Sequence, residues 1–488
     1  MQHALLPLFV FISVLSSSVF AQPNQASQQV KPYQPKGATC VIRNSDGEVV
    51  LVQDYLTRTF SLPGGYIDSD ETFQAAAKRE TFEETGITVD VGERLDIDDN
   101  RVVFACQPKE SVGYIDPVIE NRFGAKIIPA LNSKHFGKEI RQVYLAPLTP
   151  SVVDKYRYPS DSDALKSWIK TSHTSAFHVL DDLTNGASEL HTEQLPFMAS
   201  FQAWAKSMPI IGSLLTIGNG LGEGAFAVGL LVLLLLLLPL RYGLTLAFAL
   251  LATAYSVNLL KMGFAIPRPF YLLPSLQQAQ ASGFSFPSGH TTQAAAVVGL
   301  LLGWVTKRCE QHGYISPSAA IVSWFALSLL AGAARVWLGV HYPTDIIAGI
   351  GLGGLIALLS LKVYQFRCAN QRRLVESKRL WLLLLVVYLF GTLQLLQPLY
   401  VFAWFAALGL FISLFMNNQQ SNVLKLNPWQ QVIASIIGVM VIAGVSMALV
   451  SSATTSTLLL AVNALAILIG VLWILVGSPY LTRRFKHC

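Results

Sequence analysis

The chain has 488 residues, of which 52% are hydrophobic and only 13% are charged. This composition excludes an ordinary soluble protein, and the length predicts several domains. The net charge of +6 does not indicate nucleic-acid binding, because most of the basic excess lies in short loops beside apolar runs, as membrane orientation requires.

The N-terminal segment has an apolar core followed by small residues and a Val-Phe-Ala ending. This pattern predicts a secretory signal peptide, residues 1–21, that is cleaved after Ala21. An uncleaved anchor is the alternative, because no Lys or Arg precedes the core. Residues 22–34, rich in Gln and Pro, are expected to form a flexible leader. In either case the residues that follow are exported.

Strand-like segments then surround a helix with three closely spaced acids. The stretches ATCVIRN, EVVLVQD and RVVFACQ predict strands. On the intervening helix, Glu80, Glu83 and Glu84 fall at positions i, i+3 and i+4 and share one face. Like charges repel, so either this is a solvated helix face or the glutamates bind a hard cation such as Mg²⁺ or Mn²⁺.

The segment GYIDSDETFQAAAKRETFEETGI resembles the Nudix box, with one departure at Thr81, where an aliphatic residue is usual. The resemblance implies an exported α/β/α sandwich over residues 35–206 that hydrolyses a small diphosphate with the help of Mg²⁺ or Mn²⁺. Residues 110–188 are expected to carry an insertion and substrate-selecting loops. The implied metal ligands are Glu80, Glu83, Glu84 and Gly65, supported by Glu71 and Arg79.

Nine apolar runs follow, most of them near the ~20 residues that cross a bilayer. They predict an all-α polytopic membrane domain of about nine transmembrane helices, the last four forming an extension over residues 380–477. If the N-terminal domain is exported, the strongly basic loops after the odd-numbered runs face the cytoplasm, in agreement with the positive-inside rule. The runs are 225–240, 242–260, 291–305, 319–340, 346–361, 380–396, 400–415, 432–450 and 457–476.

Three basic residues do not follow this charge pattern, namely Lys261, Arg268 and Arg335. The predicted topology brings them together at the outer face with His290, His341 and Asp345. Scattered interfacial residues are the alternative explanation. Ionisable groups at membrane depth are costly, however, and usually functional. Fixed cations bind phosphate oxygens, and an imidazole held by a carboxylate four residues away can attack phosphorus.

The segments KMGFAIPRP, PSGH and ARVWLGVHYPTD resemble, in order and spacing, the three-part signature of the type 2 phosphatidic acid phosphatase superfamily, over residues 209–364. The resemblance implies a nucleophile at His341, oriented by Asp345 and forming a phosphohistidine, with His290 as the general acid. No metal is implied. Phosphate would be bound by Lys261, Arg268, Ser288, Gly289 and Arg335. One position departs, because Ala334 stands where the family usually has Ser.

These features predict a phosphatase of membrane lipids in a bacterial inner membrane, with both sites facing the periplasm. Undecaprenyl diphosphate is the favoured substrate. The alternatives are phosphatidylglycerophosphate, diacylglycerol diphosphate and lipid A phosphates. A lipid-phosphate binding or transport protein with vestigial motifs is a different class, but the last four apolar runs contain no acidic, basic or His residue to form a path.

Two cysteines, Cys40 and Cys106, lie in the exported domain. An oxidising compartment permits a disulfide between them, although buried free thiols in strands are equally ordinary. The sequence leaves both possibilities open.

Overall fold

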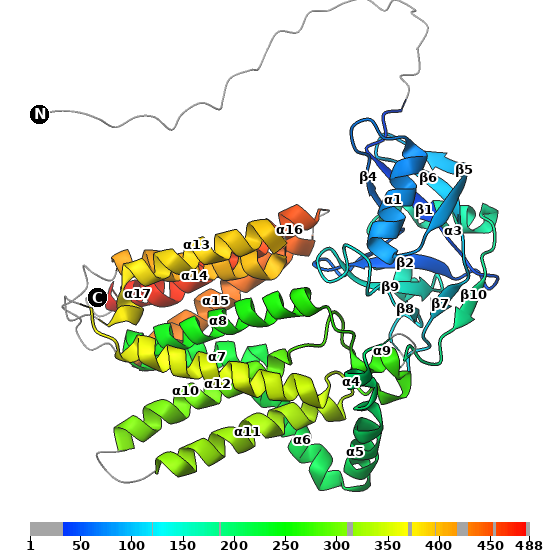
Figure 1. Cartoon of the computed structure of the whole chain (residues 1–488). Coiled ribbons are helices and arrows are strands. Elements are labelled where there is room, and N and C mark those ends of the chain that lie inside the picture. The colour runs from blue at the N-terminus through cyan, green and yellow to red at the C-terminus, as the bar shows by residue number, and fades with distance from the viewer. Residues whose placement is uncertain are drawn as a thin grey trace, which may run out of the picture.

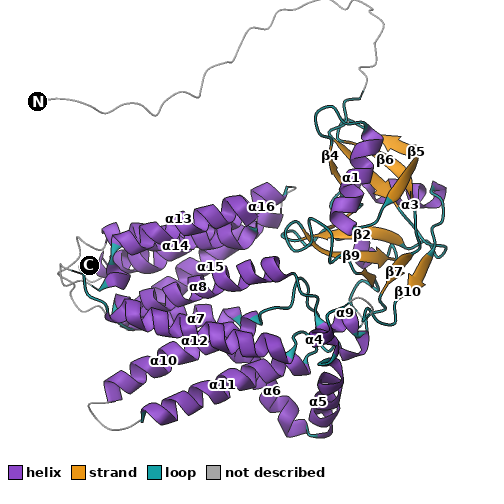
Figure 2. Cartoon of the chain, viewed as in Figure 1, coloured by secondary structure: helices purple, strands orange, loops and turns teal. Residues whose placement is uncertain are grey.

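The computed structural model describes residues 33–119, 121–184, 187–309, 316–368, 373–395, 397–416, 428–451 and 455–484. The predicted signal peptide and nearly all of the leader therefore lie outside the described residues. Strands are confined to the N-terminal domain, residues 33–184, whereas the membrane domain, residues 187–484, is helical (Figures 1 and 2).

The N-terminal domain contains two four-stranded sheets, with strand orders β4-β1-β6-β5 and β3-β2-β9-β8, and a small β10-β7 pair. In the first sheet β1 pairs parallel with β6 and antiparallel with β4. The strands are β1 (Gly37–Val41), β2 (Val49–Asp54), β3 (Phe60–Ser61), β4 (Gly64–Tyr66), β5 (Val89–Ile97), β6 (Arg101–Pro108), β7 (Val112–Tyr114), β8 (Lys126–Ile128), β9 (Ile140–Ala146) and β10 (Phe177–Val179).

Helices cover the strands on two sides and bury two separate cores. Helix α1 (Phe73–Thr85) buries Ala76 and Ala77 against one set of strand residues. Helix α3 (Ser162–Thr171) buries Trp168 in the second core. This arrangement matches the predicted sandwich. The remaining short helices are α2 (Pro150–Val153) and η1 (Pro159–Asp161).

A disulfide joins Cys40 of β1 to Cys106 of β6, with Cα atoms 5.4 Å apart. This distance is typical of a disulfide, because the two strands are neighbours in the sheet. Both residues belong to the core under α1. The tertiary structure thus selects one of the two possibilities that the sequence left open.

Helix α1 has a clear start and end. The Thr72 side chain accepts a hydrogen bond from Ala75 N, which caps the first turn, and Gly86 ends the helix in the left-handed region with φ of 75°. The acidic face of α1 is therefore held in a defined register against β1 and β4.

The membrane domain contains a helix in each of the nine predicted apolar ranges. Six helices, α8, α11, α12, α14, α15 and α16, are long and apolar enough to span a bilayer, and the pair α6 and α7, bent by 52°, would add a seventh among the described residues. The total number of crossings and their orientation remain predictions.

The main helices are α5 (Leu195–Ser207), α6 (Pro209–Leu221), α7 (Gly224–Leu237), α8 (Leu240–Phe264), α10 (Gly289–Cys309), α11 (Pro317–Trp337), α12 (Pro343–Gln365), α13 (Lys378–Leu395), α14 (Pro398–Met416), α15 (Pro428–Ser451), α16 (Ser456–Leu472) and α17 (Ser478–Arg484). Shorter helices are α4 (Glu189–Thr192), α9 (Pro269–Leu272), η2 (Pro274–Leu276), η3 (Leu374–Glu376) and η5 (Trp473–Gly477).

Helices α10 and α12 approach each other closely because small residues line their contact. A Cβ added at Gly353 would lie 2.4 Å from the Thr292 carbonyl oxygen, and one at Gly349 would lie 3.1 Å from the Ser288 carbonyl oxygen. Such glycine contacts let membrane helices pack backbone to backbone. The close contact brings the start of α10, which carries His290, beside the start of α12.

Helix α5 lies within the range predicted for the exported sandwich, 35–206, but it packs against the membrane domain. Gln202 Nε2 donates to the carbonyl oxygens of Leu276 and Trp337, both at 2.8 Å. Met198 is buried in a cluster that includes residues of α12. The sequence pattern of α5 shows that it has an apolar face but does not identify the partner of that face, which lies in the membrane domain.

Two candidate active sites

The first site, called here the cationic site, lies where α8, α10, α11 and α12 and the segment 265–288 meet. His341 Nδ1 is 3.2 Å from Asp345 Oδ2, and both side chains are buried. The same carboxylate oxygen accepts hydrogen bonds from Tyr342 N, at 2.9 Å, and from Ser285 Oγ. With Nδ1 facing the carboxylate, Nε2 is the His341 nitrogen that could attack phosphorus, and it lies beside the Arg268 guanidinium.

Backbone carbonyls hold two of the predicted cations. Lys261 Nζ donates to Phe284 O at 2.5 Å and to Ser285 O at 3.0 Å. Arg268 donates to carbonyls of the same segment and to Val340 O, and its Nη1 is 3.4 Å from His341 Nε2. These donors are already oriented beside His341, so they would not need to reorganise if charge developed on a phosphate there.

Arg335 and Ser288 complete the predicted phosphate-binding set. Arg335 Nη1 donates to Asn219 Oδ1 at 2.8 Å, whereas its buried Nε has no hydrogen-bond partner among the described residues. Ser288 Oγ accepts from Thr291 Oγ1 at 2.8 Å, and Gly289 begins α10. An unpaired buried guanidinium N–H is a donor that a phosphate oxygen could satisfy.

His290 faces a carboxylate that sequence analysis missed. Its Nε2 lies 3.3 Å from Glu223 Oε1, and the imidazole is 30% exposed. Glu223 also accepts from Asn219 Nδ2 at 2.9 Å, which connects it to Arg335. The sequence did contain a signal for this residue. Glu223 is the last acidic residue before the first apolar run, and like His290 it stands where a polar segment meets an apolar one.

The departure at Ala334 has a local explanation. Ala334 is fully buried in a cluster with Ala205 of α5 and Leu215 of α6. The alanine methyl group adds to this apolar cluster, whereas a serine hydroxyl would turn to the carbonyl one turn earlier in the helix, as Ser328 Oγ does with Trp324 O. The substitution is therefore compatible with the packing of α5 onto α11.

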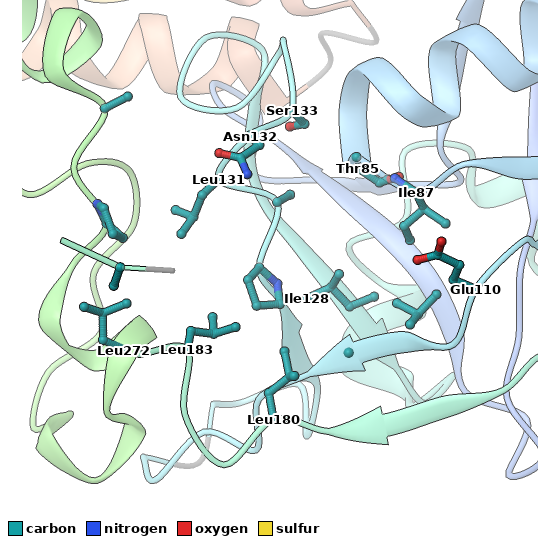
Figure 3. Close-up of a pocket in the computed structure, with 18 of the residues that line it drawn as sticks. Thr85, Ile87, Glu110, Ile128, Leu131, Asn132, Ser133, Leu180, Leu183 and Leu272 are labelled. Atoms are coloured by element: carbon teal, nitrogen blue, oxygen red, sulfur yellow. The ribbon is translucent and has the colours of Figure 1, made fainter. Parts of the chain in front are cut away.

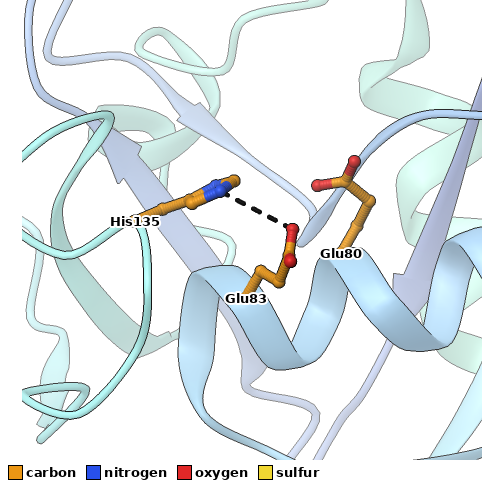
Figure 4. A group of neighbouring side chains, drawn as sticks. All are labelled: Glu80, Glu83 and His135. Atoms are coloured by element: carbon orange, nitrogen blue, oxygen red, sulfur yellow. Dashed lines mark ion pairs between the residues drawn. The ribbon is translucent and has the colours of Figure 1, made fainter. Parts of the chain in front are cut away.

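The second site, called here the acidic site, lies on α1. Glu80, Glu83 and His135 each offer one ligand atom, and these atoms all lie within 4.8 Å of one another (Figure 4). Glu84 instead accepts from Gly64 N at 2.8 Å. Gly65 lies against this site, since an added Cβ would lie 2.5 Å from the Glu80 carboxylate carbon and would displace that carboxylate. The structure thus groups two of the three predicted glutamates with a histidine.

His135 belongs to the His135 loop, residues 131–139, which sequence analysis assigned only to an insertion. Its backbone N donates to Glu83 O at 3.0 Å, and its Nε2 lies 3.6 Å from Glu83 Oε2. Carboxylates suit Mg²⁺ or Mn²⁺, while imidazole is a more usual ligand of transition metals. These residues fit a bound divalent cation.

The charges around α1 are unevenly compensated. Burial raises the pKa of Glu80 and raises that of Glu84 well above its ordinary value, because a buried carboxylate loses hydration. The pKa of Glu83 is lowered, chiefly because Lys134 donates to it. Arg79 pairs with Glu71 through two hydrogen bonds of 3.0 and 2.9 Å, and the pKa of Glu71 is lowered by this contact. A cation would stabilise the ionised form of Glu80.

Comparisons with known proteins agree with this geometry. Residues 242–368 match the model of the PAP2 superfamily, and residues 34–130 match that of the NUDIX domain. Phosphatidylglycerophosphatase B of Bacillus subtilis is 38% identical over 80 residues, which cover 16% of this chain and 38% of that protein. An undecaprenyl-diphosphatase of Sulfolobus acidocaldarius is 29% identical over 126 residues, covering 25% of this chain and 55% of that protein.

A MutT-like protein of Streptomyces ambofaciens is 32% identical over 98 residues, covering 19% of this chain and 62% of that protein. The chain thus spans between 38% and 62% of the length of these three relatives. Both matched domains indicate a hydrolase of phosphoesters or diphosphates. The chain contains a NUDIX domain in its N-terminal half and a membrane-bound PAP2 superfamily domain in its helical half.

Proposed function

We propose that the membrane domain removes the terminal phosphate of a lipid diphosphate, with undecaprenyl diphosphate as the favoured substrate, and that the N-terminal domain is a Mg²⁺- or Mn²⁺-dependent diphosphate hydrolase. Both sites would face the periplasm from a bacterial inner membrane. The observation that carries the proposal is the buried Ser285–Asp345–His341 arrangement, with Arg268 Nη1 3.4 Å from His341 Nε2.

The geometry supports a two-step hydrolysis. His341 Nε2 would attack the terminal phosphorus while Lys261, Arg268 and Arg335 bind its oxygens. The bond to the leaving oxygen breaks, and His290 gives that oxygen a proton. Water then attacks the phosphohistidine and gives a proton to His290, the P–N bond breaks, and phosphate leaves. Glu223, 3.3 Å from His290 Nε2, orients the imidazole and accepts its N–H.

The acidic site would supply a different chemistry. Glu80, Glu83 and His135 would hold the cation, which polarises a diphosphate and activates water when bound. Glu71 holds the Arg79 side chain in place, and Arg79 Nη1 lies 2.8 Å from Glu80 Oε1. Glu71 and Arg79 together therefore position the Glu80 carboxylate. The substrate would be a diphosphate linked to another group, such as a nucleotide derivative.

Other lipid phosphates remain candidate substrates, namely phosphatidylglycerophosphate, diacylglycerol diphosphate and lipid A phosphates. The residues of the cationic site contact phosphate and do not select the lipid tail. A binding or transport protein is the alternative class. Release of phosphate from a panel of purified lipid phosphates and diphosphates separates these possibilities, because a transporter or binding protein releases none.

Trapping of the phosphoenzyme tests the mechanism directly. Quenching without acid should capture an acid-labile phosphoprotein in the wild type and none in His341→Ala. His290→Ala should still form it, but about 10²-fold more slowly. Phosphoprotein in His341→Ala at the wild-type level would contradict the assignment of the nucleophile.

Thiol labelling of intact spheroplasts tests the orientation. A membrane-impermeant reagent under reducing conditions should label a cysteine introduced at Ser282 and should not reach Cys309 or Cys368. Labelling of the two native cysteines, with none at Ser282, would place both sites in the cytoplasm.

A further inference from the structure

The His135 loop contacts both the acidic site and the membrane domain. Towards α1, Ser133 Oγ donates to Glu84 O at 3.1 Å, and His135 itself belongs to the metal group. Towards the membrane domain, the Phe136 ring packs edge-on against Phe284 with centroids 5.5 Å apart, and Gly137 O accepts from Gln397 Nε2 at 2.8 Å. A single loop therefore separates the acidic site from the ends of the membrane helices.

A second contact between the two halves lies near Glu84. Asp54 and Glu84 share a pocket of about 100 Å³ that is also lined by Glu139, Arg157 and Tyr158. Asp54 Oδ2 accepts from Ser456 Oγ, at the start of α16, at 2.8 Å. The four-helix extension thus contacts the His135 loop through Gln397, just before α14, and the end of β2 through Ser456.

A cleft of about 850 Å³ lies between the two halves (Figure 3). One wall includes Thr85 at the end of α1 and residues 131–133 of the His135 loop. The opposite wall includes residues 264–267, which directly precede the phosphate-binding Arg268, and Leu272. The cleft is lined by apolar and polar side chains together, so it suits an amphipathic headgroup region better than a purely charged ligand.

We infer that the substrate of the NUDIX domain is a lipid-linked diphosphate, in which the diphosphate joins a membrane-embedded lipid to a polar group, and that the cleft admits its headgroup. The inference rests on the proposed function and specifies its substrate class. A site bordered by the ends of membrane helices is close to diphosphates held at the bilayer surface, whereas a soluble nucleotide derives no advantage from this placement.

The chemistry of such a substrate requires the acidic site to act before the cationic site. At the acidic site water adds to one phosphorus of lipid–O–P–O–P–O–X, and the bridging P–O bond breaks. The products are a lipid monophosphate and the phosphate of X, and the proton released by water passes to solvent. The lipid monophosphate now carries the terminal phosphate that the cationic site removes. The NUDIX reaction therefore supplies a substrate for the phosphatase reaction.

The test uses the full-length protein in detergent micelles with farnesyl diphosphoryl-N-acetylglucosamine. This compound is called here the capped lipid, because a sugar covers its terminal phosphate. With Mg²⁺, the wild type should release farnesol and phosphate, and His341→Ala should accumulate farnesyl monophosphate. Glu83→Gln should leave the capped lipid intact yet still dephosphorylate added farnesyl monophosphate. That last reaction is the internal control for an intact cationic site.

Two negative results distinguish failure of this inference from failure of the proposed NUDIX activity. If His341→Ala cleaves ADP-ribose and leaves the capped lipid intact, the lipid substrate is wrong and the NUDIX hydrolase stands. If it cleaves neither compound, the proposed NUDIX activity itself is wrong. Cleavage of the capped lipid by Glu83→Gln at the wild-type rate would overturn the inference, since the acidic site would then not act on it.

Two further measurements test the placement of the site. Gln397→Leu removes the contact with the His135 loop and should raise KM for the capped lipid about tenfold, as expected for one buried hydrogen bond, without changing KM for ADP-ribose. Thr392→Val on α13, whose hydroxyl donates to Tyr388 O of the same helix, is the matched control. Equal KM changes for both substrates in Gln397→Leu would contradict a lipid-specific role.

Binding without metal provides an independent readout. The same capped lipid with a diazirine on the sugar, irradiated in EDTA, should label peptides that contain residues 128–133 or 264–267. Labelling confined to segments outside the cleft would overturn the inference.

Discussion

The two candidate sites carry opposite charges, although we propose that both bind phosphate groups. The cationic site contains Lys261, Arg268 and Arg335 and therefore carries its own positive charge. The acidic site presents Glu80 and Glu83 and needs a cation from solution to approach a diphosphate. At membrane depth fixed cations can be held by backbone carbonyls, whereas a site on an exposed domain can exchange a metal with water.

The sites also differ in how they are built. Most of the acidic site lies on one helix, so local spacing brings its glutamates together. The cationic site joins the ends of four helices, and its geometry depends on how these helices pack. Substitutions in the acidic site should therefore act on one activity alone, while packing changes between α10 and α12 should affect the cationic site.

The largest expected effect is at the nucleophile. His341→Ala should lower lipid dephosphorylation by more than about 10⁴-fold, as for loss of a covalent nucleophile, and should leave cleavage of ADP-ribose unchanged. EDTA should spare the wild-type phosphatase reaction. The measurement is phosphate release from a lipid diphosphate, with exposed His173→Ala as the control. A phosphatase reaction that stops on chelation would remove the contrast between the sites.

Loss of a metal ligand should be the next largest effect. Glu83→Gln should lower Mg²⁺-dependent diphosphate cleavage by about 10³-fold, because a bound cation supplies several kcal/mol of charge stabilisation. Lipid dephosphorylation should stay near the wild-type rate. Glu93→Gln, on an exposed position of β5, is the control. A parallel loss of both activities would show that the two sites are not separate.

The carboxylate beside the general acid should matter less. Glu223→Gln keeps the shape and loses the charge, so we expect about a tenfold fall in kcat for lipid dephosphorylation. The alkaline limb of the pH–rate profile should move to lower pH, because His290 would lose a neighbouring negative charge that favours its protonated form. An unchanged profile would mean that Glu223 does not act on His290.

The smallest expected effect concerns the packing of α10 against α12. Gly353→Ala forces a Cβ against the Thr292 carbonyl and should destabilise the membrane domain by about 1–3 kcal/mol, seen as a lower unfolding temperature in detergent. Gly351→Ala on the same helix meets no atom within 4 Å and is the matched control. Equal melting temperatures in the two variants would show that α10 can move away from α12 without loss.

Residues that are close along the chain could be assigned to the sites from the sequence. The three glutamates of α1 and the pair His341 and Asp345 are each separated by a few residues on a helix or at its start, so a 3.6-residue period is enough to bring them together. The three-part signature supplied the remaining members by resemblance. Ser285, Glu223 and His135 escaped, because each contacts its partner across a distance in sequence that no local period encodes.

The sequence by itself determined the two halves, their predicted chemistry and the charge of each site, because hydrophobicity, spacing and residue type are local properties. Only the tertiary structure decided that α5 packs on the membrane domain, that Cys40 bonds Cys106, that Glu223 faces His290 and that the His135 loop lies between the acidic site and the membrane helices. Those contacts depend on which surfaces meet when the chain folds, and apolar surfaces of similar composition can be buried against more than one partner.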